Sequence, residues 1–254
     1  MLLALDVGNT NITLGVYRGS ELAGRWRLKT DRDQTADGWG ILCRNLFGLS
    51  DLDIGQVSGV VIASVVPPLD SVLEEMAERY FRARPLFVGP GVKTGLAVLV
   101  DNPSEVGADR IVNGVAAFHK YGGPCVVVDF GTALTFDAVS ARGEYLGGII
   151  CPGIGIAAEA LFSRTARLPR VDLREPGKLI GANTVASIQS GLYYGAIGAV
   201  DGILERLIET LGPETKCVAT GGQARLVAPS SRRLRQIDDN LTLDGLRIIW
   251  EKNR

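Results

Sequence analysis

The chain has 254 residues, 27 Lys and Arg against 28 Asp and Glu, a formal net charge of −1 and 46% hydrophobic residues. This length suits two small domains, and the apolar fraction predicts a sizeable core. The balanced charge argues against a nucleic-acid partner, because neutralising a phosphate backbone needs a basic surplus. We interpret Arg232, Arg233 and Arg235 as a solvated stretch before the last helix rather than as a basic patch.

The cysteines and the first residues favour a soluble, cytoplasmic protein with no membrane partner. The four cysteines stand far apart, without a C-x-x-C pair, at Cys43, Cys125, Cys151 and Cys217. Residues 1–6 resemble a strand and lack the basic and long apolar regions of a secretory signal. The longest apolar stretch, residues 146–162, contains Pro152 and several glycines and is too short and too broken to span a bilayer.

An internal repeat is the strongest organisational signal. Residues 4–13 read ALDVGNTNIT and residues 127–135 read VVDFGTALT. With one extra residue in the first copy, both follow the pattern apolar-apolar-Asp-apolar-Gly-Thr-x-apolar-Thr. Each copy lies between apolar arms and predicts a β-hairpin. The repeat therefore predicts a duplicated α/β fold with a cleft between the copies, and a chance similarity of two hairpins is the alternative.

The other elements alternate between strands and helices. Strands are predicted at residues 57–66, 86–88 and 217–220, and helices at residues 69–82, 156–162, 185–211 and 241–250. One further helix has a strong start signal, with Asn102 as cap, Pro103 at the first position and Glu105 at the capping-box position. We expect this helix to run to Lys120, before Gly122 and Gly123.

The two Asp-x-Gly loops have the chemistry of phosphate-binding sites. Glycine permits a tight turn close to an anion, while Asn and Thr side chains supply neutral donors to phosphate oxygens. An aspartate repels phosphate, so it is better placed to hold a bridging cation. Gly221 and Gly222, which follow the strand at residues 217–220, suit a close approach by adenosine. No P-loop or protein-kinase motif is present, and similar loops also occur in hairpins without a ligand.

Asp109 is the candidate general base for transfer of a phosphoryl group to a hydroxyl. It falls at the edge of an apolar stripe formed by Ala108, Ile111, Val112 and Val115, where a carboxylate is partly shielded. An ordinary ion pair on the helix surface is the alternative interpretation of this residue.

Together these residues resemble the type III pantothenate kinases, bacterial enzymes of the actin, heat-shock-protein and sugar-kinase superfamily. The resemblance covers almost the whole chain and agrees in order and spacing. It is carried by residues 6–11 (DVGNTN), 64–68 (SVVPP), 89–95 (GPGVKTG), 101–103 (DNP), 107–110 (GADR), 129–132 (DFGT) and 147–148 (GG).

The resemblance implies duplicated ribonuclease H-like (actin-like ATPase) domains with a nucleotide cleft between them. We expect an N-terminal subdomain at residues 1–118 and a C-terminal one at residues 119–254, with the last helix packing back on the first. It also implies ATP-dependent phosphorylation of pantothenate to 4′-phosphopantothenate, the first step of coenzyme A synthesis, by a homodimer.

The resemblance further implies a set of site residues. ATP would be bound by Asp6, Val7, Gly8, Asn9, Thr10, Asn11, Ile12, Thr13 and Thr132. Pantothenate would be bound by Val100, Gly107, Ala108, Asp109, Arg110 and Thr184, with Asp109 as proton acceptor. Asp129 resembles the ligand of a monovalent cation, K⁺ or NH₄⁺, and Asp6 is placed to support Mg²⁺ through water.

Two departures from the family pattern keep other functions open. The family commonly has Tyr where this chain has Val100, so a contact to pantothenate is missing, and it often has Thr where Leu134 stands. A kinase for another small alcohol is therefore one alternative. The other is a nucleotide-binding regulatory protein on the same fold, which an intact Asp109 disfavours. Asp109 and Arg110 both face one substrate only if the helix starts late, near Gly107, or if the pocket wraps around its end.

Overall fold

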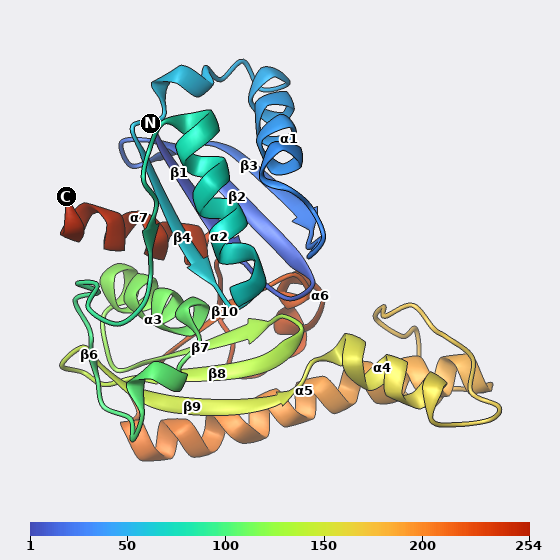
Figure 1. Ribbon diagram of the computed structural model, residues 1–254. Helices are drawn as coiled ribbons and strands as arrows, with labels where there is room; N and C mark the ends of the chain where they lie inside the picture. The colour runs from blue at the N-terminus through green and yellow to red at the C-terminus, as the bar shows by residue number, and fades with distance from the viewer. The chain divides into compact units, whose positions relative to one another are not determined.

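The computed structural model describes residues 1–254 and divides them into two compact units. Unit 1 comprises Met1–Gly95, Asp101–Ala116 and Thr242–Arg254, and unit 2 comprises Leu96–Val100 and Ala117–Leu241. Each unit is built on its own β-sheet, and the colours of Figure 1 follow the chain through both. The fold is mixed α/β, as expected. None of the helices combines the length and the apolar character needed to cross a membrane.

The sheet of unit 1 has five strands in the order β3-β2-β1-β4-β5. The β1–β2 and β2–β3 pairs are antiparallel, while β4 runs parallel to β1 and β5 parallel to β4. The central strand β1 is almost wholly buried, which explains its continuous apolar sequence. The strands are β1 (Leu2–Val7), β2 (Asn11–Arg18), β3 (Glu21–Lys29), β4 (Gly59–Ser64) and β5 (Leu86–Phe87).

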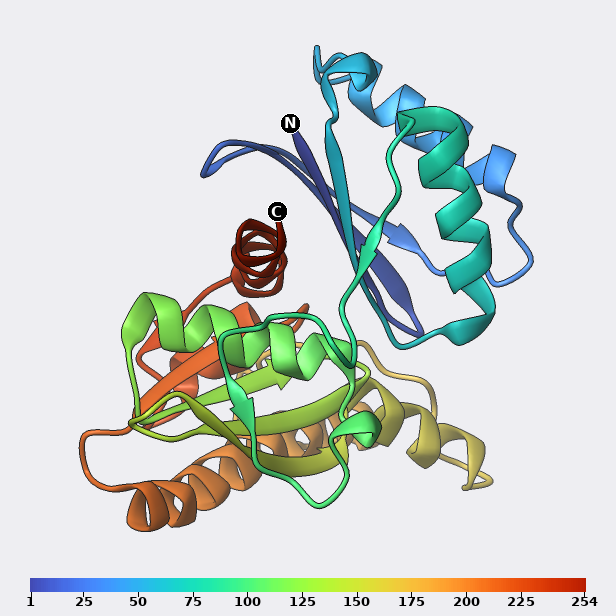
Figure 2. The same cartoon turned by 60° about the vertical axis from the view of Figure 1, so that its left-hand side comes forward.

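Helices cover both faces of this sheet (Figure 2). The helices α1 (Ala36–Gly48) and α2 (Pro67–Met76), the latter continued by a π-helical turn at Ala77–Phe81, pack with alternate strand residues in one core. The last helix, α7 (Leu241–Asn253), lies on the opposite face. There its side chains pack directly against two glycines of the sheet. A Cβ added at Gly15 would lie 2.8 Å from the Leu243 side chain, and one added at Gly59 would lie 2.2 Å from the Trp250 side chain.

The sheet of unit 2 has six strands in the order β11-β10-β7-β8-β9-β6. The β7–β8 and β8–β9 pairs are antiparallel, and β10 runs parallel to β7. Two short strands complete the edges, β11 parallel to β10 and β6 parallel to β9. The strands are β6 (Ala97–Val98), β7 (Cys125–Phe130), β8 (Ala133–Val139), β9 (Glu144–Pro152), β10 (Lys216–Thr220) and β11 (Gln236–Ile237).

The two sheets confirm the internal repeat. In both, three antiparallel strands are followed by two parallel ones, so β3-β2-β1-β4-β5 corresponds strand for strand to β9-β8-β7-β10-β11. The repeated aspartates occupy the same register, with Asp6 opposite Thr13 and Asp129 opposite Thr135. Chance similarity of two hairpins does not extend to the order of whole sheets, and the shared order is that of duplicated ribonuclease H-like domains.

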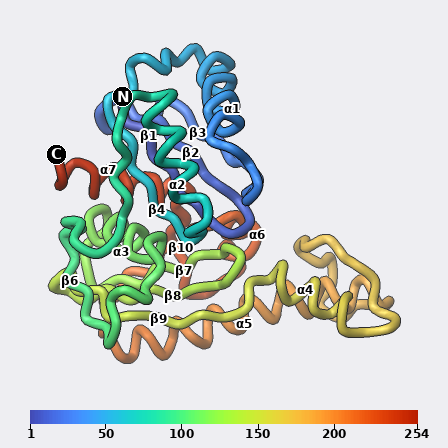
Figure 3. The backbone as a smooth tube through the Cα atoms, in the orientation of Figure 1, coloured from blue at the N-terminus to red at the C-terminus, as the bar shows by residue number.

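Helices α4 (Ile154–Ser163), α5 (Thr184–Leu211) and α6 (Ala224–Val227) belong to unit 2. They pack on the face of the sheet formed by Val126, Val128, Leu134 and Phe136. A long irregular connection, residues 164–183, joins α4 to α5 (Figure 3). The helices α4, α5 and α7 were all predicted within a few residues of their bounds.

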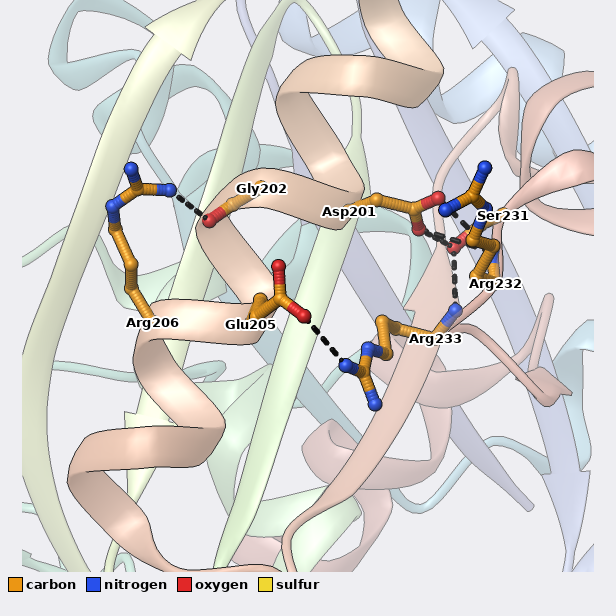
Figure 4. A network of polar contacts seen from close by, with 7 residues as sticks. All are labelled: Asp201, Gly202, Glu205, Arg206, Ser231, Arg232 and Arg233. Carbon is orange, nitrogen blue, oxygen red and sulfur yellow. Dashed lines mark hydrogen bonds and ion pairs between the residues drawn. The ribbon is translucent and has the colours of Figure 1, made fainter.

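Side chains of α5 hold the segment that leads to β11 (Figure 4). Asp201 accepts hydrogen bonds from the Ser231 hydroxyl (2.5 Å) and from the backbone N–H of Arg232 (3.1 Å), and Glu205 pairs with Arg233 at 2.7 Å. Arg232, Arg233 and Arg235 are exposed, which confirms that this basic stretch is solvated.

The predicted start of the helix at Asn102 is wrong. Asn102 caps a 3₁₀ turn, Pro103–Glu105, and α3 begins later and spans Ala108–Tyr121. Extended backbone at Val106 separates the two, and the Glu105 carboxylate accepts from the Asn102 side-chain amide (2.7 Å). A capping sequence satisfies the first N–H groups of either kind of helix, so it marks a helical start without giving its length.

Candidate functional site

The first repeated loop closes the β1–β2 hairpin of unit 1. Asp6 is partly buried near the end of β1, while Asn9 and Thr10 are exposed at the tip of the loop. The Gly8 N–H donates to the Asn11 carbonyl (3.0 Å), so this donor closes the turn rather than facing an anion. The side chains of Asn9 and Thr10 are therefore the exposed polar groups of this loop.

The segment after β3 contacts this loop, which sequence reasoning missed. The Thr30 hydroxyl donates to the Gly8 carbonyl (2.6 Å), and the Thr30 N–H donates to the Thr10 carbonyl (3.0 Å). The Arg32 guanidinium donates to the Asn9 side-chain oxygen (2.8 Å). In the sequence these residues are about twenty positions from the loop and form no motif, so only the β2–β3 pairing could have pointed to them.

The helix α3 places Gly107, Ala108, Asp109 and Arg110 at its N-terminus. Because α3 begins at Ala108, both Asp109 and Arg110 lie in its first turn. The Gly107 carbonyl accepts from the N–H groups of Arg110 (3.1 Å) and Ile111 (3.4 Å), which starts the helix. The late start is one of the two conditions under which both side chains can face one substrate.

Glycine at position 107 leaves room for the Asp109 carboxylate. A Cβ there would lie 2.5 Å from Asp109 Oδ1 and 3.4 Å from a methyl group of Val65. The same Oδ1 accepts from the Arg110 N–H (2.8 Å). Burial raises the pKa of Asp109 above its ordinary value, and the Arg110 N–H and positive charge oppose that shift. A partly shielded carboxylate with a raised pKa has the character of a general base.

Unit 1 brings the first loop and Asp109 to the same end of its sheet. Strands β1 and β4 are parallel and end together, with Val7 opposite Ser64. The Val65 N–H, just beyond β4, donates to the Val7 carbonyl (3.0 Å). Since Val65 also lies beside Gly107, the start of α3 stands at the edge where the Asp6 loop emerges.

The second repeated loop closes the β7–β8 hairpin of unit 2. The Gly131 N–H donates to the Ala133 carbonyl (3.1 Å), the counterpart of the Gly8 bond with one residue fewer. Asp129 is partly buried and lies between Thr135 of β8 and Thr220 of β10. Gly221 has a φ of 94°, and a Cβ there would lie 2.3 Å from Asp129 Oδ1. This glycine, predicted to suit adenosine, thus packs against the Asp129 carboxylate.

The start of α4 lies against the exposed tip of this second loop. Gly153 caps α4, and a Cβ there would lie 2.1 Å from the Thr132 carbonyl oxygen. Helix N-termini carry partial positive charge and unpaired N–H groups, which favour a nearby anion. Thr132 therefore stands beside a feature that suits phosphate.

The two remaining candidate residues also belong to unit 2. Val100 is partly buried and lies against Gly147 of β9, which has a φ of 106°. Thr184 is exposed at the first position of α5, whose cap Asn183 accepts from the Ala186 N–H (2.9 Å). The structure thus brings together the Asp6 loop and residues 107–110 in unit 1, while Val100, Asp129, Thr132 and Thr184 belong to unit 2.

No group of three or more His, Cys, Asp and Glu side chains forms a ready metal site. A cation bound with a nucleotide needs less from the protein, since Mg²⁺ commonly takes one or two carboxylates and completes its shell with phosphate oxygens and water. Asp6 and Asp129 each offer one carboxylate of this kind at the end of a strand.

Comparison with known proteins gives one consistent family. The family model described as type III pantothenate kinase matches residues 2–206. A relative named type III pantothenate kinase from Solibacter usitatus (strain Ellin6076) is 64% identical over 100% of this chain and 97% of its own length. A second of that name, from Anaeromyxobacter sp. (strain Fw109-5), is 57% identical over the full length of both chains.

Solved structures share the fold at lower identity. A Campylobacter jejuni protein described as a member of the Baf family of transcriptional activators has a TM-score of 0.61 at 20% identity, covering 99% of this chain and 98% of its own. The ethanolamine utilization protein EutJ from Carboxydothermus hydrogenoformans has a TM-score of 0.59 at 15% identity, covering 97% and 89%. At these identities the likeness concerns the fold alone.

Proposed function

This chain belongs to the type III pantothenate kinase family, and we propose that it phosphorylates pantothenate with ATP to give 4′-phosphopantothenate, in coenzyme A synthesis. The full-length match carries this conclusion, because relatives of that name are 57–64% identical over the whole chain. Phosphoryl transfer asks a protein mainly to position two substrates and to stabilise charge, and the two hairpin loops and Asp109 suit those tasks.

We propose that ATP is held by the loop Asp6–Thr13 and by Thr132. In the first loop, the exposed Asn9 and Thr10 side chains offer donors that carry no charge. In the second, Thr132 lies beside the start of α4, where the helix dipole favours an anion. The hydrogen bonds from the Gly8 and Gly131 N–H groups across their turns keep both loops compact.

We propose that Asp109 accepts the proton of the pantothenate hydroxyl as its oxygen bonds to the transferred phosphorus. The residues around it, Gly107, Ala108 and Arg110, would line the pantothenate pocket, with Val100 and Thr184 contributing from unit 2. At Val100 the side chain offers only apolar contact, so the polar contacts to pantothenate must come from the other residues.

The cations belong to the same proposal. Asp6 would hold Mg²⁺ through water, and Asp129 a monovalent cation, K⁺ or NH₄⁺. Such cations neutralise phosphate charge when bound. We also propose a cytoplasmic setting, because all four cysteines are free thiols, as a reducing compartment keeps them.

The activity itself is the first test. Purified protein with ATP, MgCl₂ and KCl is expected to form 4′-phosphopantothenate, measured by coupled ADP release and by mass spectrometry of the product. Replacing K⁺ with Na⁺ should lower the rate, and chelating Mg²⁺ should abolish it. No turnover of pantothenate under any of these cation conditions would refute the proposed function, and turnover of another small alcohol instead would favour the alternative acceptor.

Asp109→Asn is expected to lower kcat roughly 10²–10⁴-fold, the usual contribution of a general base. In the wild type, kcat should fall as pH drops through the raised pKa of Asp109, because the protonated carboxyl cannot accept a proton. The variant should lose this dependence. A near-wild-type kcat would place the base elsewhere.

Thermal unfolding of Asp109→Asn supplies the control. Because the pKa of Asp109 is raised in the folded protein, the protonated carboxyl contributes more to the free energy of unfolding than the ionised one. That contribution is lost as pH rises through the folded-state pKa. The neutral amide avoids that loss, so the Tm of the variant at pH 7 should equal or exceed that of the wild type.

Gly107→Ala is expected to lower kcat roughly 10- to 100-fold with little change in Tm. The added methyl group would overlap Asp109 Oδ1 and displace the carboxylate, and small displacements of a reacting group are costly. Gly48→Ala, where a Cβ meets no atom within 4 Å, is the matched control and should keep wild-type kcat. If Gly107→Ala also keeps it, the place of the carboxylate beside Gly107 is unimportant.

We propose that a second copy of the chain packs against the glycine-lined face of α5 in unit 2. Large apolar side chains are also exposed in this unit, on β9, on α4 and in the α4–α5 connection, namely Leu146, Ile149, Ile150, Ile156, Leu161, Phe162, Leu179 and Ile180. On α5, Gly191, Gly195 and Gly198 share one helix face, and a Cβ at any of them meets no atom within 4 Å. Glycine inside a helix destabilises it by about 1 kcal/mol relative to alanine, so these glycines are unfavourable in a lone chain. Close packing of a partner against this face would offset that cost.

The dimer is tested by Gly195→Arg, which puts a large charged group on that helix face. Light scattering after size exclusion should give a dimer mass for the wild type and a monomer mass for this variant, while Gly48→Arg in unit 1 should remain dimeric. A monomeric wild type would exclude the dimer, and a dimeric Gly195→Arg would move its interface to another surface.

A further inference from the structure

Two residues outside the family motifs, Thr30 and Arg32, contact the tip of the Asp6 loop. Thr30 makes two hydrogen bonds to the loop backbone, from its hydroxyl to the Gly8 carbonyl (2.6 Å) and from its N–H to the Thr10 carbonyl (3.0 Å). Arg32 makes one to a loop side chain, from its guanidinium to Asn9 Oδ1 (2.8 Å). Each residue at the tip, from Gly8 to Thr10, thus has a bond to this segment.

The segment itself is fixed at both ends. The β2–β3 pairing extends to Lys29 opposite Asn11, immediately before Thr30. The Asp31 carboxylate accepts from the Asp33 N–H (3.1 Å) and so closes a turn around Arg32. Thr35 then caps α1. Arg32 is therefore an exposed side chain on an anchored backbone.

The Arg32 contact determines how Asn9 presents its amide. A guanidinium has only donors, so the group that Asn9 turns toward Arg32 must be its carbonyl oxygen. The NH₂ group of Asn9, with two donors, then points away from Arg32 and is oriented to bind an acceptor such as a phosphate oxygen.

We propose that Thr30 and Arg32 are positioning residues of the nucleotide site. Thr30 holds the backbone of the loop tip, and Arg32 fixes the Asn9 amide in the orientation that donates to phosphate. The proposal rests on the proposed role of the Asp6–Thr13 loop in binding ATP, and it assigns the Arg32 effect to Asn9 rather than to a direct contact with the nucleotide.

The test is a double-mutant cycle with Arg32→Gln and Asn9→Ala. The readouts are the Kd for ATP by isothermal titration calorimetry, which needs no acceptor substrate, and the KM values for ATP and pantothenate. Arg32→Gln should weaken ATP binding roughly 3- to 10-fold, the effect of one hydrogen bond, and leave the KM for pantothenate within about twofold. In the Asn9→Ala background it should have no further effect.

Three further variants accompany this cycle. Thr30→Val, which removes the hydroxyl and keeps the shape, should weaken ATP binding on its own. Arg25→Gln, at an exposed arginine of β3 opposite Gly15, is the charge-matched control and should bind ATP as the wild type does. Arg32→Lys, whose ammonium group can still donate to the Asn9 side-chain oxygen, should recover part of the affinity.

Three outcomes would overturn the proposal. Wild-type ATP affinity in Arg32→Gln, with a weakened Asn9→Ala, shows that Arg32 does not position Asn9. An Arg32→Gln effect that persists in full without Asn9 shows that the arginine acts on the nucleotide itself. Unchanged ATP affinity in Asn9→Ala shows that Asn9 does not bind ATP, so Arg32 has no ATP ligand to position. This result differs from failure of the proposed function, which would appear as no phosphorylation of pantothenate by the wild type.

Discussion

Both units depend on the same hairpin arrangement. Near the end of a buried central strand, an aspartate stands opposite a threonine on the next strand, as Asp6 does with Thr13 and Asp129 with Thr135. In each copy a glycine N–H bonds back across the turn, from Gly8 to Asn11 and from Gly131 to Ala133. This bond lets the strand reverse directly beyond the aspartate, so the loop tip projects from the sheet edge. Because the next parallel strand ends at the same edge, further groups gather there, Val65 in unit 1 and Gly221 in unit 2.

The duplicated loops have nevertheless diverged in what surrounds them. The extra residue of the first loop adds Asn9, and the segment from Thr30 to Arg32 supports its tip. The second loop lacks that residue and is contacted by two glycines instead, with Gly153 against Thr132 and Gly221 against Asp129. A loop with exposed amides and hydroxyls suits phosphate, and a partly buried carboxylate suits a cation. These different surroundings support the proposed roles of the Asp6 loop in binding ATP and of Asp129 in binding a monovalent cation.

The start of α3 connects this architecture to the proposed chemistry. Extended backbone at Val106 delays the helix until Ala108, which puts Asp109 and Arg110 together in its first turn. Gly107 admits the carboxylate, while α7 holds the same helix from behind, since a Cβ at Gly245 would lie 2.2 Å from the Val112 carbonyl oxygen. The candidate base is thus set by packing on two sides of one helix.

The sequence by itself determined the repeat, the hairpins, most helices and the family, because these depend on local periodicity, turn residues and spaced motifs. Tertiary structure alone decided the start of α3, since the Asn102 signature serves a 3₁₀ turn as well as an α-helix. It also decided the two-residue strands β6 and β11, whose pairing partners are distant in the chain. The contacts of Thr30 and Arg32 with the Asp6 loop belong to the same class, because they arise from cross-strand register, which no short sequence pattern encodes.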